Sequence, residues 1–253
     1  MTKVKDIFNF IDTTAPFNSA MDFDNVGILV GNEMDIVTKC IVALDITQNV
    51  ITEAVNAKAN LILSHHPVIF TPLSTLKNNS IPYTLAQNGI NAICVHTNLD
   101  IAPNYGVNAC LAKTLQLRQI QQIDPIGTIG MLSQEMTAIE LAQFVEKKLH
   151  AIGVRLNAIE KKINRVIICS GSGGNLVSTA TKLGMDALIT GEIKHHEILF
   201  ANDHNLVVID AGHFATENVV VKPLTTLLSK EFKNVQFIES TTCTNPYANF
   251  ASI

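Results

Sequence analysis

The feature that most constrains the fold is an alternation of short β-branched runs with amphipathic helical patterns. This alternation is typical of an α/β protein with a largely parallel, buried sheet. Residues 41–44 begin one such unit, and residues 47–58 after them predict a capped helix. Its inward side chains are expected to be Val50, Ile51, Ala54 and Val55.

Residues 118–135 interrupt this alternation around Asp124-Pro125-Ile126-Gly127. We therefore expect two α/β halves with mainly buried sheets. The N-terminal half would be residues 1–125 and the C-terminal half residues 126–253.

Two helix boundaries can be predicted in the C-terminal half. Thr137 and Glu140 form a capping box that starts a helix ending at about His150. Pro223 is expected to break or kink a later helix near residues 221–222.

Charge and hydropathy exclude some classes of partner. The chain has 18 Lys and Arg against 22 Asp and Glu, a net charge of −4, which predicts no general attraction to nucleic acid or anionic membranes. Its N-terminus is charged, and its apolar runs are far shorter than the roughly 20 residues that span a bilayer. These features predict a soluble, cytoplasmic protein.

The five cysteines are widely scattered and odd in number. They form neither a disulfide framework nor a zinc ribbon pattern. We expect them to be small buried side chains.

Two successive predicted strands end in residues of the types that commonly ligate metals. Residues 61–63 lead into Ser64-His65-His66-Pro67, and residues 90–95 lead into His96-Thr97-Asn98-Leu99-Asp100. Pro67 favours an extended His66, which would splay the two imidazoles so that they could serve two different metals. Because the ends of parallel strands converge, Asp100 could complete or bridge such a site.

The C-terminal half shows the same pattern, in which metal-ligand residue types follow apolar strands. His213 and Glu217 lie four residues apart at a helix start after Gly212, so both face the same volume. Six of the eight histidines follow apolar strands, and only His150 and His204 do not. The six are His65, His66, His96, His195, His196 and His213.

Imidazole and carboxylate ligands without cysteine suit zinc, manganese, iron, cobalt or nickel and do not choose among them. Two divalent ions with two carboxylates would leave a positive centre in spite of the net charge of −4. An anionic small molecule, for example a nucleotide, fits such a centre.

The turn Ser170-Gly171-Ser172-Gly173-Gly174 between a strand and a helix has two interpretations. It could hold an anion on its backbone N–H groups, although it lacks the lysine of a P-loop. It could also be a tight connection that needs positive φ angles, which we favour.

Five motifs together resemble those of the GTP cyclohydrolase 1 type 2 homologs, also called Nif-three-like proteins. The resemblance extends from about Val4 to Pro246, with the motifs in the same order. The motifs are Asp24-Asn25-Val26-Gly27 with Gly31, Ser64-His65-His66-Pro67, His96-Thr97-Asn98-Leu99-Asp100, Gly191-Glu192-Ile193-Lys194-His195-His196 and Gly212-His213-Phe214-Ala215-Thr216-Glu217.

This resemblance implies a dinuclear divalent metal centre enclosed by the two α/β halves, with Glu217 as the bridging ligand. It also implies a ring-shaped homohexamer. Longer members carry an inserted domain that this chain lacks. The implied ligands are the same five that spacing nominates: His65, His66, Asp100, His213 and Glu217.

Other motif residues are assigned less specific roles. Phe23 replaces a tryptophan common in the family, which we expect to affect packing only. Asp24 and Asn25 are interpreted as a turn that closes the crevice rather than as catalytic residues. His96, Glu192 and His195 could orient ligands, transfer protons or be buried structural residues, and we take His96 and Glu192 as the catalytic candidates.

Two functions follow from these observations. In the first, a metal-dependent hydrolase uses metal-acidified water to attack a nucleotide-like substrate, for GTP at the purine imidazole carbon. No guanine-reading motif is recognisable, so this reaction depends on the family name. In the second, the protein is a non-enzymatic metal-binding scaffold or regulatory interaction protein. Five ligands shared by two metals leave positions open, which favours the hydrolase.

Overall fold

The computed structural model describes residues 1–123, 126–157 and 160–248, which form two compact units. The first unit comprises residues 1–105 and 221–244, and the second comprises residues 106–220 with the segment that begins at Asn245. Each unit combines helices with one mixed sheet, which confirms the predicted α/β class.

The two units differ from the expected division at residues 125 and 126. Helix α10 (Val221–Glu231) and strand β11 (Gln236–Glu239) belong to the first unit, because β11 pairs in parallel with β2 (Lys39–Ala43). Asp124 and Pro125, around which the boundary was expected, lie outside the described residues.

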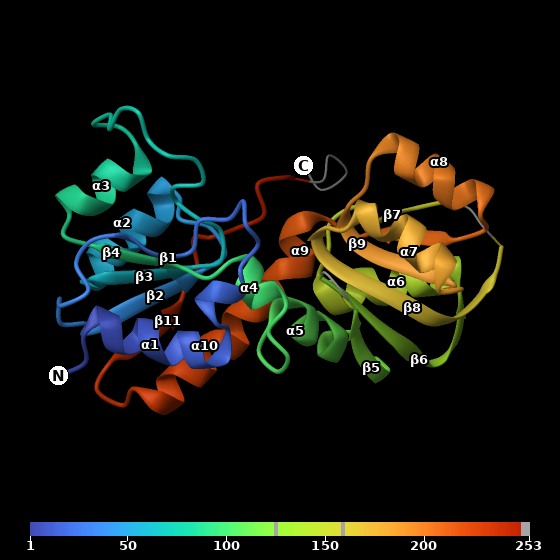
Figure 1. Ribbon diagram of the computed structural model, residues 1–253, viewed down its shortest axis with the longest axis horizontal. Coiled ribbons are helices and arrows are strands. Elements are labelled where there is room, and N and C mark those ends of the chain that lie inside the picture. Colours follow the sequence, from blue (N-terminus) through green and yellow to red (C-terminus); the bar gives the residue numbers. More distant parts are fainter. Residues whose placement is uncertain (124–125, 158–159, 249–253) are drawn as a thin grey trace. The chain divides into compact units, whose positions relative to one another are not determined.

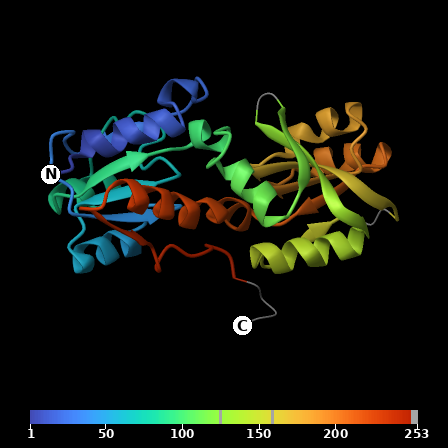
Figure 2. The same cartoon turned by 90° about the horizontal axis from the view of Figure 1, so that it is seen from below.

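The first unit is built on a five-stranded sheet in the order β1-β4-β3-β2-β11. Only β1 is antiparallel to its neighbour, β4; the other neighbouring pairs are parallel. Helices α1 and α10 lie along one face of this sheet, and α2 and α3 along the other (Figures 1 and 2). The remaining elements are α1 (Val4–Thr14), β1 (Gly27–Val30), α2 (Gln48–Ala57), β3 (Leu61–Ser64), α3 (Ile81–Gln87), β4 (Asn91–Cys94) and α4 (Thr97–Asp100).

Helix α2 begins where its cap predicts. The hydroxyl of Thr47 accepts a hydrogen bond from the backbone N–H of Val50 at 3.3 Å. Val50, Ile51 and Ala54 are buried against the sheet, as expected. Val55 was expected to face inward, but it is 44% exposed, because the packed face of α2 continues from Ala54 to Ala57 and leaves Val55 to one side.

The second unit is built on a six-stranded sheet in the order β5-β6-β8-β9-β10-β7. Strands β8, β9 and β10 are parallel to one another, and the other three pairs are antiparallel. Its elements are α5 (Val107–Thr114), β5 (Arg118–Ile123), β6 (Gly127–Thr137), α6 (Ala138–Leu149), β7 (Arg155–Leu156), β8 (Lys162–Ser172), α7 (Val177–Lys182), β9 (Ala187–Glu192), α8 (His195–Asp203), β10 (Val207–Asp210) and α9 (His213–Glu217).

The segment that was expected only to interrupt the alternation contains two strands of this sheet. Strand β5 is exposed at every residue except the half-buried Ile123 and pairs with β6 at the edge of the sheet. Because an exposed edge strand needs no apolar alternation, its Gln-containing sequence gave no strand pattern. The sheet is therefore less parallel than expected.

The capping box is confirmed, and the helical run is interrupted just before residues 221–222, where a break was expected. Thr137 and Glu140 form the capping box of α6, which ends at the left-handed His150. After α9 the chain passes through a 3-10 turn at Asn218–Val220 before α10 starts at Val221. Pro223 thus lies in a first helical turn, where its missing N–H is not required.

Strands β8 to β10 are buried on both faces. Ile168 and Ile189 pack on the side of α5 and α6, whereas Ile167, Leu188 and Val208 pack on the side of α7 and α8. Two-sided burial explains their continuous apolar sequence. These strands provide a rigid base for the residues at their carboxyl ends.

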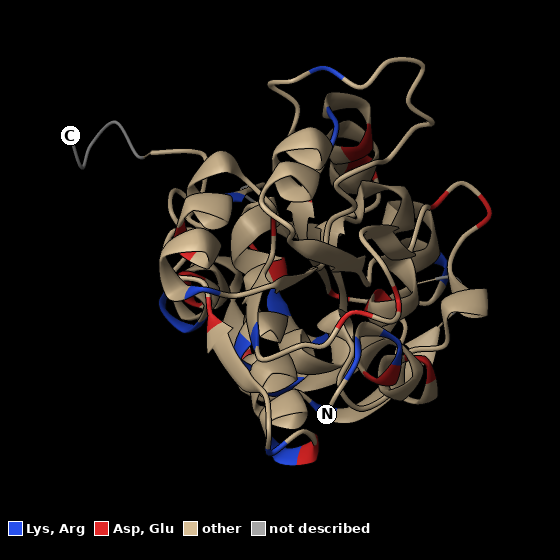
Figure 3. Cartoon of the chain, turned by 90° about the vertical axis from the view of Figure 1, so that its left-hand side faces the viewer, with Lys and Arg blue, Asp and Glu red and all other residues tan. Residues whose placement is uncertain are grey.

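The distribution of charged residues agrees with the small net charge of the sequence. Basic and acidic residues are interspersed in Figure 3. Within the described ranges, no helix is long and apolar enough to cross a membrane.

Four of the five cysteines are buried, as expected: Cys40, Cys94, Cys110 and Cys169. Cys243 is only half-buried. Burial raises the pKa of the Cys110 thiol to about 11.

Candidate metal centre

Three imidazoles lie together at the carboxyl ends of β3 and β4 in the first unit. His65 and His66 follow β3, and His96 follows the neighbouring parallel strand β4. The ring centroids are 4.9 Å apart for His65 and His66, 5.1 Å for His65 and His96, and 5.5 Å for His66 and His96. One nitrogen from each ring lies within 4.8 Å of the others, so this histidine cluster could hold a metal ion.

Each ring of the histidine cluster is fixed through Nδ1. His65 Nδ1 lies 2.9 Å from the carbonyl oxygen of Val95. His66 Nδ1 lies 2.7 Å from Asp45 Oδ1, and His96 Nδ1 lies 2.8 Å from Asp24 Oδ1. Because a carbonyl or an ionised carboxylate only accepts, each Nδ1 carries a proton and donates it. Nε2 is then the nitrogen that can offer a lone pair to a metal.

Asp24 has a role that its sequence did not indicate. Its side chain is fully buried, and besides His96 it accepts hydrogen bonds from the Thr97 N–H at 3.0 Å and the Thr97 hydroxyl at 2.6 Å. Burial alone would raise the pKa of this carboxyl, but the bonds from His96 and Thr97 outweigh it and hold the pKa well below its usual value. Asp24 therefore orients His96 rather than merely forming a turn.

Asp100 lies beside the histidine cluster. It ends the short helix α4, which begins after His96, and it is 9% exposed. Its Oδ1 lies 3.6 Å from His65 Nε2, too far for a hydrogen bond but suited to sharing a cation. The first unit thus brings together the nominated residues His65, His66 and Asp100, with His96 beside them.

The second unit brings together the other two nominated ligands. His213 and Glu217 lie one turn apart on α9, with His213 Nε2 2.9 Å from Glu217 Oε2. His213 Nδ1 lies 2.9 Å from Glu192 Oε1 at the end of β9. Since the Nδ1 proton is donated to Glu192, Nε2 and the Glu217 oxygen repel each other unless a cation lies next to both. A proton or a metal ion could fill that role.

Two glycines give α9 the space to approach the sheet. A Cβ atom on Gly171 would lie 2.1 Å from Glu217 Oε1 and 3.3 Å from His213 Cε1. A Cβ atom on Gly191 would lie 2.7 Å from His213 Cα. At residue 171 the contact is with the end of the Glu217 side chain, and the φ of +58° favours glycine, whereas at residue 191 the contact is with the backbone of α9.

The glycine-rich turn around Gly171 uses its N–H groups internally. The Gly171 N–H donates to Thr216 Oγ1 at 3.0 Å, and the Gly173 N–H donates to Thr190 Oγ1 at 2.9 Å. These donors are aimed at protein hydroxyls. The geometry thus favours a tight connection over an anion site.

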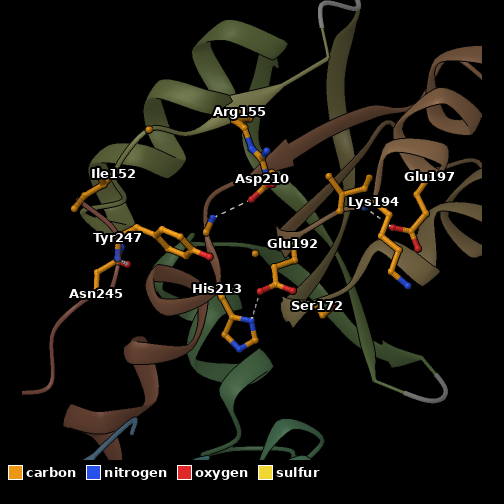
Figure 4. A pocket seen from close by; sticks show the side chains of 14 residues that line it. Ile152, Arg155, Ser172, Glu192, Lys194, Glu197, Asp210, His213, Asn245 and Tyr247 are labelled. Atoms are coloured by element: carbon orange, nitrogen blue, oxygen red, sulfur yellow. Dashed lines mark hydrogen bonds and ion pairs between the residues drawn. The ribbon is translucent and has the colours of Figure 1, made fainter. Parts of the chain in front are cut away.

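The other two motif residues of this unit are exposed. Glu192 has a side chain that is 56% exposed and contacts His213, whereas His195 is exposed at the start of α8. Exposure of both disagrees with a buried structural role. Glu192 and His213 line a pocket of about 500 Å³ within the second unit (Figure 4).

Comparisons with known proteins match nearly the whole chain. The family model described as Duf34/NIF3 (NGG1p interacting factor 3) matches residues 2–246. A Clostridium acetobutylicum protein named "GTP cyclohydrolase 1 type 2 homolog" is 35% identical over 264 residues, which cover 97% of this chain and 98% of that protein.

Solved structures share the fold. A crystal structure of a Staphylococcus aureus hypothetical protein has a TM-score of 0.92 and 32% identity, covering 98% of this chain and 99% of that one. The structure of reduced HcgD from Methanocaldococcus jannaschii has a TM-score of 0.80 and 26% identity, covering 94% and 97%. The similarity therefore extends over sequence and fold alike.

Proposed function

Since the chain belongs to the Duf34/NIF3 family, we propose that it is a dinuclear divalent-metal protein that hydrolyses an anionic, nucleotide-like small molecule. One observation carries this proposal: His65, His66, His96 and His213 all donate through Nδ1 to a carbonyl or carboxylate. Metal-binding histidines are typically held in this way, because the bond fixes the tautomer and orients the ring.

The proposed ligands are His65, His66 and Asp100 from the first unit and His213 and Glu217 from the second, with Glu217 as the bridge. The donor set fits divalent transition metals, because it combines neutral imidazoles with carboxylates and lacks thiolates. In each unit a ligand imidazole nitrogen also faces a carboxylate oxygen, His65 toward Asp100 and His213 toward Glu217. Such pairs are suited to sharing a cation.

Bound divalent ions supply a Lewis acid for an anionic group and acidify a water molecule. The protein's own contribution is to place and move protons. His96 can accept a proton at Nε2, and Asp24, ionised and buried, stabilises the imidazolium that results. Glu192 keeps the His213 proton at Nδ1. For GTP as substrate, the reaction would open the purine imidazole ring.

The experiment combines metal analysis with a turnover assay on the purified protein. Elemental analysis is followed by incubation with a nucleotide panel that includes GTP, for wild type and for Asp100→Ala. We expect metal-dependent turnover that the variant lacks. The matched control is Asp203→Ala, which removes an exposed aspartate of α8.

Glu217→Gln tests the bridging role. We expect this variant to lose one or both metals while its circular dichroism spectrum stays native, because the sheet is held by its own core. Glu146→Gln, on the exposed face of α6, is the control. Unchanged metal content in Glu217→Gln would contradict the assignment. Two bound metals without turnover of any nucleotide would instead support the scaffold or regulatory function.

We also propose a homohexamer located in the cytoplasm, on the strength of the family resemblance. Light scattering after size-exclusion chromatography would then give six times the mass of the chain. A monomeric mass would contradict the hexamer without bearing on the metal ligands of a single chain.

A further inference from the structure

The pocket of about 500 Å³ in the second unit has a charge arrangement that the metal ligands do not explain. In Figure 4, Arg155 and Asp210 lie at one end of the pocket and Glu192 and His213 at the other. The Tyr247 ring lies at one side, and Lys194 and Glu197 lie at the opposite side. A volume of this size suits a small-molecule ligand.

Arg155 is held in place from one side. It lies on β7 opposite Asp210 of β10, and its Nη2 donates to Asp210 Oδ2. The Asp210 side chain is 5% exposed, and its Oδ1 accepts the N–H of Gly212 at 3.1 Å. Both oxygens of the carboxylate are thus fixed, so the carboxylate orients the guanidinium.

The rest of the Arg155 side chain faces solvent in the pocket. It is 76% exposed, and a guanidinium has five N–H donors, of which the bond to Asp210 uses one. An ion pair this exposed stabilises a fold only weakly. An oriented guanidinium with exposed donors is instead suited to a planar or tetrahedral oxyanion.

Apolar surface lies beside this group. Ile152 is 44% exposed and Tyr247 is 79% exposed, and both line the same pocket. An exposed tyrosine ring offers a flat surface on which a ring or other flat group can pack. The pocket therefore combines an oriented cation with a flat apolar wall.

We propose that this pocket binds a small molecule that carries an oxyanionic group, phosphate or carboxylate, next to a flat apolar part, and that Arg155 holds the oxyanion. The inference rests on the proposed function in taking that molecule as the substrate, because His213 lines the same pocket. Arg155 is then a residue that determines specificity rather than a metal ligand.

The test is a set of saturation-transfer NMR titrations of the full-length, metal-loaded protein. The probes are phenyl phosphate, benzoate and the neutral benzyl alcohol. We expect Arg155→Gln to weaken binding of the oxyanionic probe about tenfold and to leave benzyl alcohol unchanged. Arg118→Gln is the matched control, because Arg118 is an exposed arginine on β5, the opposite edge strand of the same sheet.

The two charged probes distinguish the two oxyanions, since preference for one identifies the group that the pocket accepts. Arg155→Lys keeps the charge but loses the planar fork, so we expect an intermediate affinity; it replaces Arg155→Gln if that variant does not fold. Equal affinity in wild type and the Arg155 variant would overturn the inference, as would a wild type that binds neither charged probe.

Metal analysis of every sample and a repeat after EDTA treatment separate the two proposals. Arg155-dependent binding by a protein that takes up no metal would contradict the proposed function alone. Bound metal with no effect of Arg155 would contradict this inference alone.

Discussion

The two units present similar metal-binding side chains, but they hold them by different means. In the first unit, the imidazoles are oriented by hydrogen bonds, two of them to the carboxylates of Asp24 and Asp45. In the second, the Glu192 carboxylate also orients His213, but His213 and Glu217 share one short helix whose position depends on the space left by Gly171 and Gly191. The first arrangement depends mainly on carboxylates that orient the rings, whereas the second also depends on the absence of a Cβ atom at two glycines. Each should therefore fail under a different change.

The largest expected effect is that of Gly171→Ala. The new Cβ would lie 2.1 Å from Glu217 Oε1, and the positive φ of +58° adds backbone strain. We expect the free energy of unfolding to fall by about 3 kcal/mol and the metal content to fall as Glu217 is displaced. Urea denaturation and elemental analysis measure the two effects.

Gly184→Ala is the matched control for backbone strain. Gly184 has a φ of +61° in the same unit, but its Cβ would lie 3.9 Å from the nearest atom, Arg165 Nη1. We expect a loss of only about 1 kcal/mol and unchanged metal content. Equal losses in the two variants would show that the approach of Glu217 to Gly171 is not what holds α9.

Asp24→Asn comes next and tests the first unit. The amide replaces an ionised acceptor of four hydrogen bonds, from His96, Thr97 and the Asn25 N–H, with a group that has one acceptor oxygen. We expect the free energy of unfolding to fall by about 2 kcal/mol, and ¹⁵N NMR to show that the Nδ1 proton of His96 is no longer fixed. Asp22→Asn, at an exposed neighbour, should change neither measurement.

Acid should remove the stabilisation by the ionised Asp24 carboxylate from the wild type. Burial raises the pKa of Asp24, but hydrogen bonds from His96 and Thr97 lower it further, to well below its usual value. The folded state thus binds the proton less tightly than the unfolded state. The stabilisation is complete above the unfolded value of about 4 and is lost as the pH falls below it toward the lower folded value.

Urea denaturation at several pH values between 6 and 3 measures this effect. The difference between wild type and Asp24→Asn should narrow toward pH 3. The difference between wild type and Gly184→Ala, which involves no carboxyl group, should stay constant. A difference for Asp24→Asn that widens in acid would contradict the lowered pKa.

Local patterns account for what could be predicted from the sequence. The buried parallel strands, the cap of α2 and the capping box of α6 depend on neighbouring residues, and the structure confirms them. The four-residue spacing of His213 and Glu217 likewise predicts that both face one volume, and they lie 2.9 Å apart.

The features that could not be predicted from the sequence depend on contacts between residues far apart in the chain. The pairing of β11 with β2 has no local signal, so the return of residues 221–244 to the first unit was missed. Asp24 is 72 residues from His96, and a turn was the simpler interpretation of its neighbourhood. The glycines at 171 and 191 suggested a turn or motif, but not that a helix packs against them.

The smallest expected effect is that of Asp45→Asn, which compares an exposed anchor with the buried Asp24. Asp45 accepts from His66 Nδ1 at 2.7 Å, but its side chain is 38% exposed and that of His66 is 24% exposed. Solvent screening should therefore limit the change in unfolding free energy to about 0.5 kcal/mol or less. Metal affinity, which depends on the orientation of His66, should still weaken by up to about tenfold. Calorimetric titration of metal into the EDTA-treated protein measures this change. A loss of stability as large as that of Asp24→Asn would mean that burial does not distinguish the two anchors.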